Sequence, residues 1–172
     1  MKKQKGDLMK AFMLLCVATL SAAVFGVVEI GEKAPESCWK ALDSKEICLR
    51  ELKNKTVALI YNTGWCPGCQ EEITELSKRY SEIKSPSVVI ISLSAEGFKH
   101  GQPADEEFLQ QWKKKYGIPF EVASSPNNAG KEFFNPPYYI PATVILNSKG
   151  VVQFKKVDAS VDEIFKTIKD CE

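Results

Sequence analysis

The stretch Thr63-Gly64-Trp65-Cys66-Pro67-Gly68-Cys69 decides how the rest of the chain is interpreted. It follows an apolar run at 57–61 and precedes a segment whose apolar side chains recur at helical spacing, at positions 69, 73, 76, 80 and 83. The first pattern predicts a buried strand over 56–62, and the second predicts a helix from residue 66 to about residue 84. The two cysteines are therefore expected where a strand passes into a helix.

This location favours the reactive form of cysteine. Unpaired backbone N–H groups and the helix dipole at a helix N-terminus favour a negative group, and the thiolate is the nucleophilic form of the side chain. Cys69 lies three positions after Cys66 and can reach back one helical turn to close or open a disulfide with it. The spacing predicts a centre for thiol–disulfide exchange.

The remaining patterns indicate an α/β fold. Polar residues at 31–54 predict a short hairpin with its turn near Ser44, ahead of the strand at 56–62. Later segments predict strands at 87–93, 120–123, 142–146 and 151–156, helices at 105–116 and 131–134, and a last helix that starts in a capping box of Ser160 and Glu163. The strand at 87–93 has the near-continuous apolar character of a parallel sheet.

Length and composition limit the classes of function. The 172 residues suit one domain, over 29–172, behind a short leader. A net charge of +1 gives no electrostatic reason to expect nucleic acid as a partner. His100 is the only histidine, so histidine-based metal sites and catalysis are poorly supplied, and we expect neither a cofactor nor a bound metal.

The first 28 residues are expected to direct export. Lysines at positions 2, 3, 5 and 10 precede an uncharged stretch over 11–28. The small residues Ser21-Ala22-Ala23 suit a signal peptidase that cuts before Val24, but the same stretch is long enough to stay as a membrane anchor. Residues 1–28 are thus a signal peptide or a membrane anchor, and either one places 29–172 on the periplasmic or extracellular side.

The order of these elements resembles the thioredoxin superfamily, and within it the exported thioredoxins of the TlpA/ResA type. The resemblance depends on Trp65-Cys66-Pro67-Gly68-Cys69 after a strand, and on Ile140-Pro141-Ala142-Thr143 leading into a hairpin that turns at 147–150. It implies a thioredoxin-like three-layer sandwich, in which helices cover both faces of a central mixed β-sheet and an N-terminal β-hairpin is added.

The resemblance also implies the roles of individual residues. Cys66 would attack a substrate disulfide, and Cys69 would resolve the resulting mixed disulfide. Pro141 would be a cis-proline that faces the thiols, Ile140 would offer its backbone to an extended substrate strand, and Trp65 would shield one side of Cys66. The implied partners are protein disulfides or dithiols and a membrane or exported partner that exchanges electrons. A part in cytochrome c maturation, by reducing apocytochrome cysteines, is a family implication.

Two departures from thioredoxin leave questions open. Thioredoxin has a buried acidic residue six positions before its first cysteine, where this chain has Ile60. The proton of Cys69 must then pass to water or to a nearby group such as Glu71 or Glu72. The pair between the cysteines is Pro-Gly instead of Gly-Pro, so the redox potential and the direction of electron flow stay open.

The other cysteines and one aromatic group have two interpretations each. Cys38 and Cys48, in an exported hairpin, are expected to form a structural disulfide, with a second redox pair as the alternative. Cys171 is left over near the C-terminus, either as a free thiol or as an intermolecular link. The aromatic residues near Pro141 either line a substrate groove or pack on the edge of the sheet; these are Phe133, Phe134, Tyr138 and Tyr139.

Other functions fit the sequence less well. A peroxiredoxin-like peroxidase using Cys66 is the alternative enzyme, because Thr63-x-x-Cys66 matches part of the Pro-x-x-x-Thr-x-x-Cys site of that family. However, Leu59 stands at the proline position, and the only arginines that could polarise a peroxide are Arg50 and Arg79. A zinc site or a copper-delivering binding module would need further ligands beside the two thiols.

Overall fold

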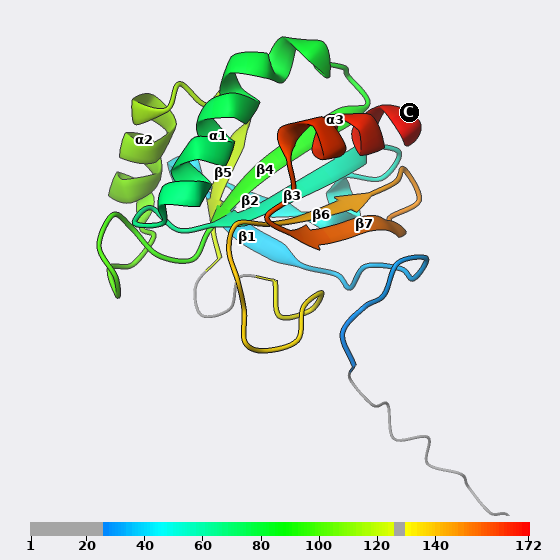
Figure 1. Ribbon diagram of the computed structural model, residues 1–172, viewed down its shortest axis with the longest axis horizontal. Helices are drawn as coiled ribbons and strands as arrows, with labels where there is room; N and C mark the ends of the chain where they lie inside the picture. Colours follow the sequence, from blue (N-terminus) through cyan, green and yellow to red (C-terminus); the bar gives the residue numbers. More distant parts are fainter. Residues whose placement is uncertain (1–25, 126–129) are drawn as a thin grey trace, which may run out of the picture.

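The computed structural model describes residues 26–125 and 130–172, which form one sheet with three α-helices (Figure 1). In chain order the elements are β1 (Cys38–Ala41), β2 (Glu46–Cys48), β3 (Thr56–Asn62), α1 (Pro67–Arg79), β4 (Val88–Ser94), α2 (Glu106–Lys115), β5 (Glu121–Ser124), β6 (Ala142–Leu146), β7 (Val152–Val157) and α3 (Val161–Asp170). Single 3₁₀ turns η1 (Leu42–Ser44), η2 (Leu49–Glu51) and η3 (Tyr80–Glu82) follow β1, β2 and α1.

The sheet is mixed, as predicted. Its strand order is β2-β1-β5-β4-β3-β6-β7. Strands β3, β4 and β5 are parallel, β6 is antiparallel to β3, and the predicted N-terminal hairpin of β1 and β2 extends the sheet beyond β5. All seven residues of β3 are buried, which is expected for a central strand covered on both faces.

The three helices all cover one face of the sheet, which corrects the expectation of helices on both faces. The inward side chains of α1, α2 and α3 belong to one apolar core that includes Ala58 and Ile60 of β3. The chain passes from β3 to β4 and on to β5 in the same direction across the sheet. Because both crossovers are expected to be right-handed, they place α1 and α2 on the same face.

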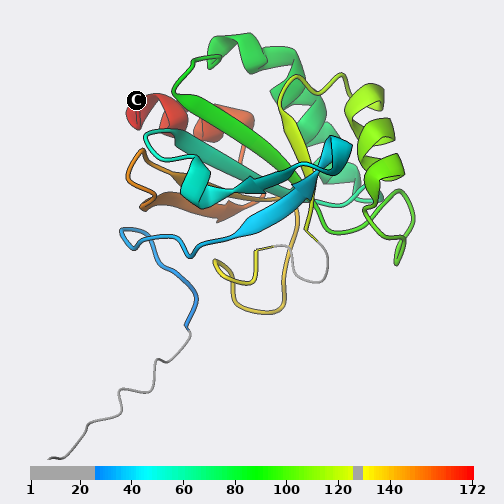
Figure 2. The ribbon, with the colours of Figure 1, turned by 180° about the vertical axis from the view of Figure 1, so that it is seen from behind.

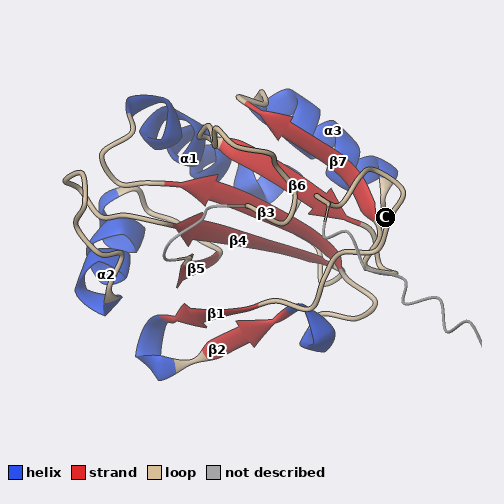
Figure 3. Cartoon of the chain, turned by 90° about the horizontal axis from the view of Figure 1, so that it is seen from below, coloured by secondary structure: helices blue, strands red, loops and turns tan. Residues whose placement is uncertain are grey.

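A second apolar core lies on the opposite face of the sheet. No α-helix of the described residues covers this face in Figures 2 and 3. Strand β3 contributes its alternate side chains to this core, which are Val57, Leu59 and Tyr61. The cover consists of the β1–β2 hairpin and the segment around Phe133, with η2 at its margin. The sandwich is therefore closed on this side by the hairpin and by loops.

The prediction of a short helix at 131–134 is wrong, because this segment forms turns. Gly130 adopts a φ of 80°, and its carbonyl accepts hydrogen bonds from the backbone N–H groups of both Phe133 and Phe134. The prolines at 136 and 137 follow at once, and a proline interior to a helix lacks the N–H that would continue it. The chain instead folds Phe133 beneath the sheet, where it packs against Tyr61.

The expected leader lies almost entirely outside the described residues, which begin at residue 26. Within the described part of the chain, no helix is both long and apolar enough to span a membrane. The division into a leader over 1–28 and a domain over 29–172 stays a prediction.

Candidate active site

The dithiol lies where the sequence pattern places it, between β3 and α1. Cys66 is the N-cap of α1, and Pro67 takes the first helical position, where its missing N–H has no helical partner to lose. The backbone N–H of Cys69 donates a hydrogen bond to the Sγ atom of Cys66 at 3.2 Å. A donor directed at this sulfur also favours its thiolate once the disulfide opens.

Cys66 and Cys69 are joined in a disulfide. Cys66 retains 6% of its surface exposed, whereas Cys69 is completely buried. Of the two residues, only Cys66 therefore retains any exposed surface, and that surface is small.

Pro141 lies against the first turn of α1. The Ile140–Pro141 peptide bond is cis. A Cβ atom built on Gly68 would lie 3.6 Å from Cδ of Pro141, so the proline and the dithiol loop are in van der Waals range. Strand β6 begins at the next residue and pairs with β3, which brings two segments about seventy residues apart to the same edge of the site.

Trp65 is held by a loop that the sequence did not connect with the site. Its side chain is 37% exposed, its indole N–H donates to the carboxylate of Glu96, and its ring stacks on the ring of His100 with centroids 5.0 Å apart. Glu96 and His100 come from the loop between β4 and α2. Two contacts from the β4–α2 loop therefore hold the side chain of Trp65, which directly precedes Cys66.

Glu72 supplies a buried carboxyl group behind the dithiol. It lies one helical turn after Cys69 on the buried stripe of α1, whereas the neighbouring Glu71 is exposed. The hydroxyl of Thr143 donates to Oε1 of Glu72 at 3.4 Å. The other carboxyl oxygen, Oε2, is buried without a hydrogen-bond partner among the described residues.

The environment of Glu72 changes its acidity. Burial raises the pKa of this carboxyl to about 8; the hydrogen bond from Thr143 opposes the rise, and the charge of Asp158 adds to it. A carboxyl that exchanges its proton near neutral pH is suited to accept the proton of a thiol and to return it. Of the two glutamates that the sequence offered, only Glu72 is buried on the face of α1 that carries Cys69.

A buried polar network supports the end of β3 beneath the dithiol loop. The side-chain N–H of Asn62 donates to Oγ of Ser92 at 2.8 Å, and the hydroxyl of Ser94 donates to Oδ1 of Asn62 at 2.6 Å. Trp112 of α2 donates its indole N–H to the same Ser92. The sequence signal for this network is three polar residues, Asn62, Ser92 and Ser94, within or at the end of apolar runs.

The aromatic segment before Pro141 divides into buried and exposed members. Phe133 is 1% exposed and belongs to the second core. Tyr138 and Tyr139 are 41% and 62% exposed. Both tyrosines precede Pro141 by no more than three residues, so they lie on the margin of the site.

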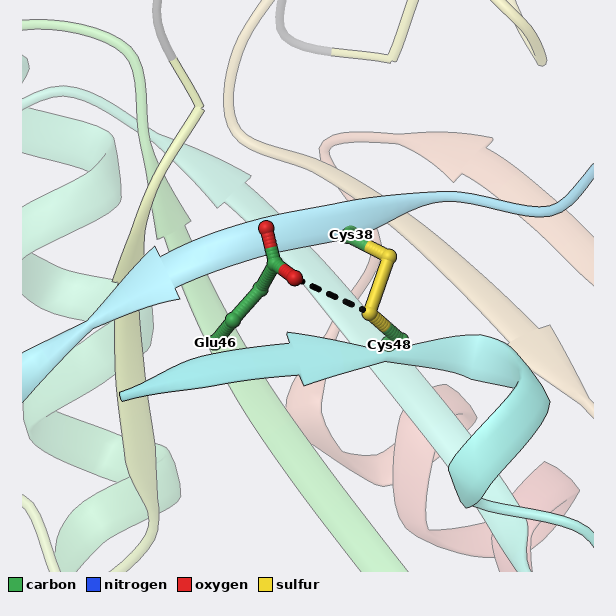
Figure 4. A group of neighbouring side chains, drawn as sticks. All are labelled: Cys38, Glu46 and Cys48. Atoms are coloured by element: carbon green, nitrogen blue, oxygen red, sulfur yellow. Dashed lines mark hydrogen bonds between the residues drawn. A yellow bond between two sulfur atoms is a disulfide. The ribbon is translucent and has the colours of Figure 1, made fainter. Parts of the chain in front are cut away.

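The second cysteine pair is remote from this site in the sheet. Cys38 and Cys48 face each other across the β1–β2 hairpin and are joined in a disulfide (Figure 4). A carboxyl oxygen of Glu46 lies 3.6 Å from Sγ of Cys48. These three side chains are close enough to share a metal ion, but sulfurs bonded to each other are not thiolate ligands.

Neither arginine lies near Cys66. Arg79 is the last residue of α1 and forms ion pairs with Glu75, Glu82 and Asp162. Arg50 belongs to η2, which precedes β3, whereas the dithiol loop follows β3. The site thus lacks a guanidinium group that could polarise a peroxide.

Comparison with known proteins relates the chain to thiol–disulfide oxidoreductases. The sequence model of the AhpC/TSA family matches residues 30–155. The thiol-disulfide oxidoreductase ResA of Bacillus cereus is 26% identical over 136 residues, which cover 79% of this chain and 74% of that protein. ResA of Bacillus thuringiensis is 33% identical over 96 residues, 56% of this chain, and the match spans about half (51%) of that protein.

Solved structures share the fold. The thioredoxin domain of a thiol-disulfide oxidoreductase from Bacteroides vulgatus aligns with a TM-score of 0.67 at 17% identity, over 83% of this chain and 97% of that domain. A thiol:disulfide interchange protein of the thioredoxin family from Chlorobium tepidum also aligns with a TM-score of 0.67 at 17% identity, over 85% of this chain and 99% of that chain. The resemblance to ResA-type thioredoxins is thus confirmed, and the chain belongs to the AhpC/TSA family, with a thioredoxin-like fold.

Proposed function

We propose that this protein is an exported thiol–disulfide oxidoreductase whose Cys66–Cys69 pair exchanges disulfides with other proteins. The observation that carries the proposal is the asymmetry of the pair: Cys66 is the N-cap of α1 and keeps 6% of its surface exposed, whereas Cys69, bonded to it, is completely buried. The names of the ResA relatives give the same reaction class.

The reaction starts from the reduced dithiol. The Cys66 thiolate attacks one sulfur of a substrate disulfide; the substrate S–S bond breaks, and a mixed disulfide forms while the other substrate sulfur leaves and takes up a proton. Cys69 then loses its proton to Glu72 and attacks Sγ of Cys66. The mixed disulfide breaks, the second substrate sulfur leaves as a thiolate and takes up a proton, and the Cys66–Cys69 disulfide remains. The same steps in reverse oxidise a substrate dithiol.

The proposal gives the remaining roles to groups around the dithiol. Pro141 lies against the dithiol loop at Gly68, and Ile140 and Pro141 would hold an extended substrate segment by its backbone. Trp65 would limit approach to the side of Cys66 that faces Pro141. Renewed exchange needs a second protein on the same side of the membrane, because the oxidised pair must be reduced before it can act again. Residues 11–28 either anchor the domain beside that partner or are removed.

Reduction of insulin disulfides tests the proposal. Cys66→Ser should abolish the activity, because it removes the attacking sulfur. Cys171→Ser, which removes a thiol at the end of α3, should keep the wild-type rate. Full activity of Cys66→Ser would show that the assignment is wrong.

A thiol peroxidase that uses Cys66 is the alternative. Thr63 is buried three residues before Cys66, and its hydroxyl has no hydrogen-bond partner among the described residues. A yeast mitochondrial 1-Cys peroxiredoxin shares the fold, with a TM-score of 0.60 at 16% identity over 83% of this chain and 76% of that one. The absence of a nearby arginine disfavours this alternative. Peroxide consumption by the reduced protein at rates far above those of a free thiol would support it.

A further inference from the structure

A basic pocket lies at the end of the sheet away from the dithiol. It has a volume of about 240 Å³ and is formed by segment 33–36, by η2 with the turn after it, and by the β6–β7 turn at 147–150. Val57, at the start of β3, lines it. The dithiol loop begins after Asn62, at the other end of this seven-residue strand. The strand separates the two sites by about 20 Å.

The rim of the pocket concentrates positive charge. Five cationic side chains line it, and Glu36 is the sole carboxylate among its described lining residues. The cations are Lys33, Arg50, Lys53, Lys55 and Lys149. The whole chain has nearly equal numbers of basic and acidic residues, 23 and 22, so this excess is local. A surface of this kind favours an anionic ligand.

Three of these cations have no competing partner. Lys55 donates to the backbone carbonyl of Pro86, and Arg50 lies 3.8 Å from the carboxylate of Glu51. The other three lysines on the rim are exposed and form no ion pair with any described residue; they are Lys33, Lys53 and Lys149. Their ammonium groups are available to a ligand.

The floor of the pocket is apolar. Leu49, Leu52 and Leu146 line it together with Val57. A bare inorganic anion would gain nothing from this surface, whereas a molecule with an anionic group next to carbon chains would bury apolar area there. The lining therefore matches an amphiphilic anion.

The chain enters the domain beside this pocket. Three backbone hydrogen bonds fix segment 31–34 on β7 and the turn before it: Gly31 N–H to Val152 O, Val152 N–H to Glu32 O, and Ala34 N–H to Gly150 O. In Figure 1 this N-terminal segment and the β6–β7 turn lie at the end opposite the start of α1. Lys33 is five residues after the apolar stretch 11–28, a span of about 17 Å at most.

We propose that the pocket binds the phosphate of an anionic phospholipid head group at the membrane surface. Lys33, Lys53 and Lys149 would hold the phosphate, while Leu49 and Leu52 would pack against the glycerol and acyl carbons. The domain would then sit with the pocket on the membrane and the dithiol directed away from it. The proposal rests on the alternative in which residues 11–28 stay as a membrane anchor, and it is independent of the thiol chemistry. The leader itself is a poor occupant, because its basic end would be repelled.

Lysine acylation followed by mass spectrometry tests the proposal. The full chain is reconstituted in phosphatidylcholine vesicles, with or without phosphatidylglycerol. Lys53 and Lys149 should be acylated about fivefold more slowly when phosphatidylglycerol is present. Lys99, on the loop beside Trp65, and Lys114, on α2, should react equally in both lipids. If each of these four lysines were acylated at the same rate with and without phosphatidylglycerol, the proposal would be overturned.

Two variants and one competitor sharpen the result. Lys53→Glu with Lys149→Glu should remove the protection of Lys33, whereas the matched pair Lys114→Glu with Lys166→Glu should keep it. Both should retain insulin reduction in detergent, which shows that they fold and separates this outcome from a failure of the proposed enzyme activity. Equal protection by soluble glycerol phosphate in phosphatidylcholine vesicles would overturn the proposal in favour of a free anion. Protection in both lipids that rises with protein concentration would overturn it in favour of a second copy.

Discussion

At the scale of single residues, Glu72 is the group that we propose as the proton acceptor for the buried sulfur of Cys69. Cys69 has no contact with solvent, so its proton needs an internal acceptor. Glu72 lies one turn further along the same buried stripe of α1, and one of its carboxyl oxygens is free of hydrogen bonds within the described structure. Burial raises the pKa of this group to about 8, so it can hold or release a proton near neutral pH.

Glu72→Gln should slow the resolving step, because the amide cannot accept a proton from Cys69. We expect release of a trapped substrate to be about 100-fold slower, the usual scale for losing one acid–base group. The wild-type rate should rise as the pH passes through about 8, where Glu72 ionises, and the variant should lack this rise. Stopped-flow kinetics of substrate release give both results. Glu71→Gln is the matched control and should behave as wild type.

The same substitution should change how stability depends on pH. The unfolded chain releases the Glu72 proton near pH 4.5, whereas the folded protein keeps it up to about pH 8. The folded state binds the extra proton between these values, so this contribution to stability is complete below pH 4.5 and is lost as the pH rises through 8. Unfolding in denaturant should show Glu72→Gln gaining about 2–4 kcal/mol relative to wild type between about pH 5 and pH 8.5. A difference that does not vary with pH would contradict the protonated, buried state.

At the scale of elements, the site depends on how closely two loops approach each other. The backbone N–H of Gly64 donates to the carbonyl of Glu96 at 3.0 Å. This contact brings the loop between β4 and α2 against the dithiol loop, where Glu96 and His100 hold Trp65. A side chain at position 64 would separate the two loops.

Gly64→Ala should therefore reduce both stability and activity. A Cβ atom there would lie 2.7 Å from the carbonyl carbon and oxygen of Gly97, and backbone cannot yield as a side-chain tip can. We expect a loss of about 1–3 kcal/mol in the free energy of unfolding and slower insulin reduction. Gly26→Ala, where an added Cβ meets nothing within 4 Å, is the control and should change neither quantity.

The elements also show what the sequence could predict. Strand β3, the dithiol and helix α1 could be predicted because three local signals agree: the spacing of apolar residues, the lengths of the two segments, and a proline at the first helical position. The face of the sheet on which α2 packs could not be predicted in this way. A helical stripe of apolar residues shows that one side of the helix is buried, but it does not show which face of the sheet covers that side. That choice follows from strand order, which depends on pairing between distant segments.

Individual side-chain contacts in the site could not be predicted from the sequence for a similar reason. Trp65 and Glu96 are 31 residues apart, and no local pattern links them. Glu71 and Glu72 are adjacent and chemically alike, so only the rotation of α1 distinguishes them. The spacing of three from Cys69 was the available signal for Glu72, since residues three apart share a helix face.

At the scale of the whole molecule, two disulfides have different consequences. Cys66–Cys69 closes a single turn at the site, whereas Cys38–Cys48 joins two strands at the edge of the sheet, with a sequence separation of 10. A loop of this length restricts the unfolded chain by about 3 kcal/mol in the chain-entropy model. We therefore propose a structural role for Cys38 and Cys48.

Replacing both Cys38 and Cys48 by serine should lower the free energy of unfolding by about 3 kcal/mol. Insulin reduction at a temperature where the variant stays folded should be unchanged. Chemical denaturation and the insulin assay measure the two effects separately. Loss of activity in a folded variant would instead show that the pair takes part in electron transfer.

The central claim, that Cys66 is the sulfur that meets the substrate, is tested most directly by trapping the mixed disulfide. The reduced Cys69→Ser and Cys66→Ser proteins are each mixed with a disulfide-containing protein, and the products are mapped by mass spectrometry under non-reducing conditions. The account predicts a stable adduct at Cys66 in Cys69→Ser and none at Cys69 in Cys66→Ser. An adduct at Cys69, or equal trapping by both variants, would contradict it.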